Sequence, residues 1–183
     1  MKIPIFTEDP GWHGLQLKQA FAERDVEAIF IPLNDCSLHI THDQNDVISI
    51  PFFERLPRGA FVRGIQAGTL QQVMTRLNIL HMLQQSDVVI YNQPKAIERT
   101  VDKAMTSFLL HKNNVPTPAT WICESRKEAE NTRQMMAEQQ QPLVIKPLFG
   151  SQGIGVRKLS AQEILPVPMQ QFVDGVYYLQ QLI

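Results

Sequence analysis

The sequence has little cysteine, little glycine and almost no net charge. Two cysteines, Cys36 and Cys123, lie far apart and outside any Cys-x-x-Cys pair, which excludes a disulfide-built scaffold and favours a reducing compartment. Lys and Arg total 17 against 18 for Asp and Glu, so the formal net charge of −1 argues against a nucleic-acid binder. This balance still allows a local basic pocket for a small anion.

Long hydrophobic runs are missing as well. No apolar stretch approaches the ~18–20 residues that span a bilayer, and the N-terminus becomes acidic too early for a signal peptide. We therefore expect a cytoplasmic protein with no membrane partner. With 183 residues, of which 44% are hydrophobic, the chain has the composition of one or two folded domains.

Strand and helix patterns alternate over residues 1–93. Apolar runs predict strands at 2–6, 27–33, 47–50, 60–63 and 88–91, and apolar stripes predict helices at 13–24 and 69–83, the second capped by Thr69. The alternation predicts an open, mostly parallel α/β sheet. The domain boundary is expected near residues 93–98.

Three polar residues follow predicted strands of this sheet. His13, Arg63 and Asn92 lie toward carboxyl ends of strands, where open α/β sheets bind ligands. Arg63 and Asn92 are candidates to hold a substrate carboxylate, which arginine can grip with two hydrogen bonds. The alternatives are a structural salt bridge for Arg63 and a loop or capping role for His13.

Two further groups are interpreted as structural. Cys36, His39, His42 and Asp43 crowd one segment, but a second ligand pair is not evident, so a polar loop is favoured over a metal site. The tryptophans, Trp12 and Trp121, are expected to be packing residues.

The second half of the sequence has a different order of predicted helices and strands. Helices are predicted at 97–112 and 126–141, and strands at 119–123, 143–146, 156–159 and 176–183. Pro116 and Pro118 end the first of these helices.

Three of the nine glycines, Gly150, Gly153 and Gly155, fall within six residues, just after Lys146. Val156 follows Gly155 where a Walker loop needs Lys, and the spacing GxxGxG between two strands does not fit a dinucleotide fingerprint. A flexible hairpin remains, whose backbone N–H groups could cradle an anion, with Ser151 and Lys146 adding a hydroxyl and a charge. The alternative is an ordinary glycine-rich hairpin beside a solvated lysine.

Four ordered blocks, residues 92–103, 115–118, 146–155 and 178–183, resemble the ATP-grasp superfamily, in particular its RimK-like branch of glutamate and amino-acid ligases. Residues 60–64 also fit that branch. The match covers residues 59–183 well and 1–58 only in outline. The resemblance implies an α/β pre-ATP-grasp substrate domain at 1–95, followed by the first, α+β half of an ATP-grasp domain at 96–183.

The same resemblance implies site roles. Lys103 and Lys146 would contact the phosphates of ATP, with Lys146 a candidate to contact the adenine as well, and the hinge strand would bind adenine through its backbone. This chain has Gln181 where the family commonly has Glu. The implied ATP-binding residues are Lys103, Lys146, the lid Gly150, Ser151, Gln152, Gly153, Ile154 and Gly155, and the hinge Gln180, Gln181, Leu182 and Ile183.

The function implied is ATP-dependent carboxylate–amine ligation through an acylphosphate, adding glutamate or another amino acid. The Mg2+ ligands of the family are not evident, so we expect them beyond residue 183, and we expect this chain to be an N-terminal fragment that is inactive alone. An exposed hinge-strand edge would favour a homo-oligomer. The alternatives are a non-catalytic nucleotide-binding or assembly module and a purine-type carboxylate ligase.

Overall fold

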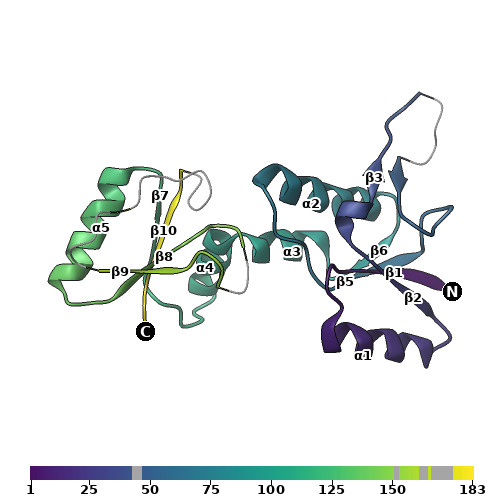
Figure 1. Cartoon of the computed structure of the whole chain (residues 1–183), viewed down its shortest axis with the longest axis horizontal. Coiled ribbons are helices and arrows are strands. Elements are labelled where there is room, and N and C mark those ends of the chain that lie inside the picture. Colours follow the sequence, from purple (N-terminus) through teal and green to yellow (C-terminus); the bar gives the residue numbers. More distant parts are fainter. Residues whose placement is uncertain (43–46, 151–152, 161–164, 166–174) are drawn as a thin grey trace. The chain divides into compact units, whose positions relative to one another are not determined.

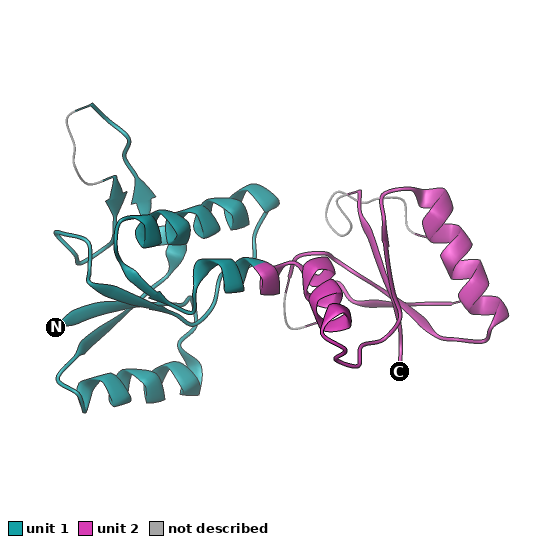
Figure 2. Cartoon of the chain, turned by 180° about the vertical axis from the view of Figure 1, so that it is seen from behind, with its two compact units in different colours: residues 1–98 teal, residues 99–183 magenta. Residues whose placement is uncertain are grey.

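The structure is a computed structural model that describes residues 1–42, 47–150, 153–160, 165 and 175–183. It divides into two compact units, Met1–Glu98 and Arg99–Ile183, which Figure 2 colours separately. The division falls within helix α3 (Pro94–Val101). Within the described ranges, no helix is both long enough and apolar enough to cross a bilayer.

The first unit is built on a parallel sheet. Strands β1 (Lys2–Phe6), β2 (Glu27–Ile31), β5 (Gly59–Val62) and β6 (Val89–Tyr91) are arranged in the order β2-β1-β5-β6, and every pairing is parallel. This confirms the predicted open α/β sheet. Because the strands run in one direction, their carboxyl ends meet at one edge of the sheet.

Helices α1 (Gly11–Ala22) and α2 (Leu70–Gln85) cover opposite faces of this sheet (Figure 1). Helix α1 packs Leu17 and Phe21 on one face, and α2 packs Leu80 and Leu83 on the other. The predicted cap is confirmed, since Thr69 begins α2 with a reciprocal capping box. The rest of the unit is a 3-10 turn (Leu33–Asp35) and a small antiparallel pair, β3 (Ser37–Leu38) and β4 (Ile48–Ser49).

The second unit contains an antiparallel sheet. Strands β7 (Thr120–Cys123), β10 (Tyr177–Gln181), β8 (Leu143–Lys146) and β9 (Arg157–Leu159) are ordered β7-β10-β8-β9. Helix α5 (Arg126–Glu138) packs Ala129 and Met136 against one face, over the buried Tyr177 and Leu179. Helix α4 (Lys103–Lys112) contacts the sheet through Ser107, whose hydroxyl lies 2.7 Å from the hydroxyl of Tyr178.

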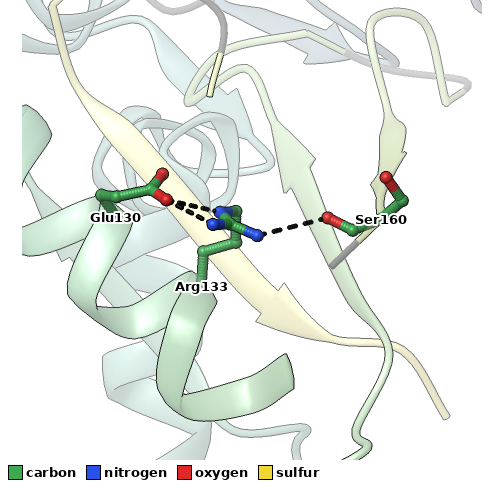
Figure 3. A network of polar contacts seen from close by, with 3 residues as sticks. All are labelled: Glu130, Arg133 and Ser160. Atoms are coloured by element: carbon green, nitrogen blue, oxygen red, sulfur yellow. Dashed lines mark hydrogen bonds and ion pairs between the residues drawn. The ribbon is translucent and has the colours of Figure 1, made fainter. Parts of the chain in front are cut away.

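A polar network ties the end of β9 to helix α5 (Figure 3). The guanidinium of Arg133 donates hydrogen bonds to Glu130 on the same helix, and its Nη1 donates to the Ser160 carbonyl at 3.5 Å. The hydrogen bond from Arg133 holds the pKa of Glu130 below its ordinary value. Helix α5 is thereby fixed to the sheet by polar as well as apolar contacts.

Three expectations are wrong. The single helix predicted over 97–112 is two helices, because Asp102 interrupts it and accepts hydrogen bonds from the backbone N–H groups of Ala104 and Met105 as the N-cap of α4.

The last strand ends at Gln181 and is not an edge, since β10 pairs with β7 on one side and β8 on the other. The argument for self-association from an exposed hinge strand therefore fails. Trp12 is 68% exposed and is not a packing residue.

Candidate functional site

Lys103 lies at the first position of α4, next to the loop that follows β8. Its Nζ donates to the carbonyl of Gly150 at 2.9 Å and to that of Leu148 at 3.3 Å. Its backbone N–H also donates to Leu148, at 3.4 Å. The start of α4 and the segment that leads into the glycine loop are thus in direct contact, although 45 residues separate them in sequence.

Lys146 is the last residue of β8. Its Nζ donates to Oε1 of Gln180, on the neighbouring strand β10, at 2.5 Å. Gln180 is 8% exposed, and its Nε2 donates to Oγ1 of Thr120 at 3.0 Å and to the hydroxyl of Tyr178 at 3.2 Å. The lysine is therefore held at one face of the sheet by a buried neutral amide.

The charge of Lys146 affects the ammonium group of Lys103. Burial lowers the pKa of Lys103 below its ordinary value, and the charge of Lys146 lowers it further, while the nearby Asp102 opposes the shift. Among the residues that the structure describes, the ion pairs are His81–Glu98 and Arg133–Glu130, and neither involves these two lysines. Lys103 and Lys146 thus lie close enough to interact electrostatically, and neither forms an ion pair with a carboxylate within the described part of the chain.

The glycine loop begins beside these lysines. Gly150, Gly153 and Gly155 have φ of +126°, +73° and +76°, conformations that side-chain-bearing residues rarely adopt. Ile154 is 70% exposed, and Ser151 and Gln152 lie outside the described residues. The glycines are therefore needed for the path of this loop, whatever it binds.

Two backbone N–H groups of the hinge segment, residues 180–183, already donate hydrogen bonds within the second unit. The N–H of Gln181 donates to Ala119 and that of Leu182 donates to Pro142, both at 2.9 Å. The Gln181 side chain donates to Gln141 at 2.8 Å, and Ile183 is 90% exposed. A backbone contact to adenine would therefore use carbonyl groups of this segment or the N–H of Ile183.

The remaining candidates belong to the first unit. The backbone N–H of Arg63 donates to Phe6 at 2.9 Å, and Nδ2 of Asn92 donates to Val62 at 3.4 Å, so both residues lie at carboxyl ends of parallel strands, as predicted. The Arg63 side chain is exposed. His13 is exposed in the first turn of α1, and its ring meets that of Trp12 edge-on at 5.0 Å.

In the part of the chain that the structure describes, no three His, Cys, Asp or Glu side chains gather closely enough to hold a metal ion. Asp102, the acidic residue beside Lys103, uses Oδ1 to cap α4. Carboxylate ligands for Mg2+ near the two lysines are therefore not provided by these residues.

From the sequence, Gln180 is a candidate only through its backbone, as part of the hinge strand. A role for its side chain was not predicted. The signal was a glutamine at an inward position of an otherwise apolar strand, in the run Tyr177-Tyr178-Leu179-Gln180. A buried polar side chain must find hydrogen-bond partners, so its presence there indicates a built polar site.

Residues 100–175 match the family model of the RimK-like ATP-grasp domain. The second unit is therefore similar to the RimK-like ATP-grasp domain over most of its length. The matched range contains Lys103, Lys146 and the glycine loop, and it ends just before β10.

Sequence relatives are named ligases. The chain is 25% identical over 191 residues to a tetrahydromethanopterin:alpha-L-glutamate ligase of Methanococcus maripaludis, covering 100% of this chain and 61% of that ligase. It is 29% identical over 157 residues to a probable alpha-L-glutamate ligase of Photobacterium profundum, covering 85% of this chain and 50% of that protein. The chain thus spans between half and two thirds of the length of these two relatives.

The fold agrees with solved structures. A RimK-domain ATP-grasp protein of Sphaerobacter thermophilus superposes with a TM-score of 0.71 at 18% identity, covering 100% of this chain and 64% of that protein. At this identity the likeness supports the fold alone. It confirms the predicted class, an α/β unit followed by part of an ATP-grasp domain.

Proposed function

We propose that this chain supplies the nucleotide-binding lysines of an ATP-dependent carboxylate–amine ligase. The observation that carries the proposal is the convergence of Lys103 and Lys146, two ammonium groups without a paired carboxylate, beside the glycine loop. Half-buried like charges are costly to hold together unless an anion joins them, and a triphosphate is such an anion. The glutamate-ligase relatives support the same reaction class.

The proposed reaction has two steps. A substrate carboxylate attacks the γ-phosphorus of ATP, so that ADP leaves and an acylphosphate forms. An amine then attacks the acyl carbon, phosphate leaves with the bonding electron pair, and the amine proton is released as the amide forms. Phosphoryl transfer depends on positioning and charge stabilisation, which Lys103, Lys146 and the loop N–H groups would supply.

Magnesium would add charge neutralisation in such a reaction, and the described residues contain no group of three His, Cys, Asp or Glu side chains close enough to hold it. Ligands beyond residue 183 remain a prediction. So do a cytoplasmic location and a homo-oligomeric state.

Glutamate is the proposed amine substrate, on the evidence of the relatives' names. Arg63 and Asn92 are proposed to hold a substrate carboxylate, because both lie at carboxyl ends of the parallel sheet. The division into a substrate domain at 1–95 and a nucleotide-binding unit at 96–183 is part of the same proposal.

The test separates binding from chemistry. Calorimetric titration of the chain with ATP and with adenosine should give binding that depends on the phosphates, and equal affinity for the two would contradict the proposal. Release of ADP on adding glutamate and a carboxylate acceptor would show ligation.

A further inference from the structure

A buried amide joins four elements of the second unit. Gln180 on β10 accepts a hydrogen bond from Lys146 on β8 and donates to Thr120 on β7. It also donates to Tyr178, whose hydroxyl meets Ser107 on α4. Both oxygen and nitrogen of the amide are therefore engaged, at a position where the side chain is 8% exposed.

The direction of the hydrogen bonds that Gln180 makes follows from counting protons. Oγ1 of Thr120 donates its single proton to the carbonyl of Pro118 at 2.9 Å, so it can only accept from Gln180. The nitrogen of the amide must then face Thr120 and Tyr178, and the oxygen must face Lys146. Tyr178 accepts from Gln180 through its hydroxyl oxygen, and the same hydroxyl shares a hydrogen bond with Ser107 in which either group can donate.

This network gives Lys146 a fixed acceptor that carries no charge. Within the described ranges, one of its three N–H groups donates to Gln180, and the other two can meet an anion. A carboxylate at position 180 would reach the same ammonium but would neutralise it. The amide therefore orients the cation without reducing its net charge.

We propose that Gln180 is a positioning residue for phosphate recognition, acting through Lys146 and oriented by Thr120. This inference rests on the proposed function and extends it to a side chain that does not itself meet the phosphates. It predicts that a negative charge at position 180 lowers the affinity for the phosphates and does not change the affinity for the nucleoside.

The first experiment compares ligands of rising charge. In calorimetry with adenosine, ADP and ATP, Gln180→Glu should lower ATP affinity by about 10- to 100-fold, lower ADP affinity less, and leave adenosine unchanged. Gln180→Met, which keeps the volume and the charge of the site, should cost ATP about 3- to 10-fold, and Thr120→Val a smaller loss. Gln140→Glu adds the same charge at an exposed position and should leave all three ligands unchanged. Equal losses for adenosine and ATP would overturn the proposal, because damage to the fold would weaken every ligand.

The second experiment tests the route through Lys146. In a double-mutant cycle, the charge-neutral change Gln180→Met should have almost no further effect on ATP affinity once Lys146→Met is present, since the ammonium that Gln180 orients is gone. Additive losses would overturn the role of Gln180 while leaving the proposed function intact. Absence of phosphate-dependent binding by the unmodified chain would overturn both. If Gln180→Met does not fold, the same cycle with Thr120→Val decides between these outcomes.

Discussion

Replacing Lys146 with methionine tests the pair of lysines directly. Methionine keeps an unbranched stem and removes the ammonium, whose Nζ gives one hydrogen bond to Gln180 and has two N–H groups left for a ligand. A charge-assisted hydrogen bond contributes about 1.5–3 kcal/mol, which corresponds to a loss of roughly 10- to 100-fold in ATP affinity. Relief of the repulsion between Lys146 and Lys103 returns part of this, so we expect a value toward the lower end.

The assay is calorimetric titration with ATP near neutral pH. Lys127→Met is the matched control, because Lys127 is an exposed lysine at the start of α5 in the same unit. It removes the same charge and should leave the dissociation constant within about twofold of the unmodified value. Equal affinity in Lys146→Met and Lys127→Met would refute the assignment of Lys146 to the phosphates.

The pH dependence provides an independent check on proximity. The pKa of Lys103 is lowered by burial and then by the charge of Lys146, while a bound phosphate favours the ammonium form. ATP affinity should therefore be highest below this lowered pKa and fall as the pH rises through it. In Lys146→Met the fall should move to higher pH, because one of the two lowering effects is removed. A fall at an unchanged pH would show that the two ammonium groups do not interact.

Three further changes test local features. Asp102→Ala removes the acceptor for the N–H groups of Ala104 and Met105 and should lower the free energy of unfolding by about 1 kcal/mol in chemical denaturation, whereas Asp102→Asn keeps the cap and should cost less. Gly150→Ala should lower ATP affinity by about 3- to 10-fold, because an L side chain at φ +126° costs roughly 1–3 kcal/mol and moves the carbonyl that Lys103 contacts. Burial, and secondarily the charge of Asp35, raises the pKa of the Cys36 thiol to about 12, so iodoacetamide at mildly alkaline pH should alkylate Cys123 first, as peptide mapping would show.

The first unit, with its parallel sheet, could be predicted from sequence because the patterns that specify its strands and helices are local. The continuous apolar run of β2 and the stripe of α2 with its Thr69 cap each lie within one element. The predicted bounds of β1 agree with the structure, and those of α2 differ by a residue or two at its ends. Trp12 is the exception, since local hydrophobicity cannot show whether a side chain near a helix start turns toward the sheet or toward solvent.

The second unit, with its antiparallel sheet, was harder to predict because the order of its strands depends on pairing between segments that are distant in sequence. Strand β10 lies between β7 and β8, and no local pattern in residues 176–183 gives that position. The break at Asp102 is a competition between helix continuation and a side-chain cap, which the apolar pattern across 97–112 hides. Lys103 could be identified by resemblance, but its contact with Gly150 needs the fold.

The electrostatics of the unit link its stability to its proposed ligand. Burial and then the charge of Lys146 lower the pKa of Lys103, and the amide of Gln180 accepts from Lys146 without neutralising it. The fold therefore tolerates an unfavourable interaction that a single carboxylate at position 180 would relieve. Such an arrangement is stable only because the neighbouring packing over-determines it, and a polyanion bound between the two ammonium groups would reverse the sign of the interaction. In the proposed function, this repulsion would favour a triphosphate over an uncharged nucleoside.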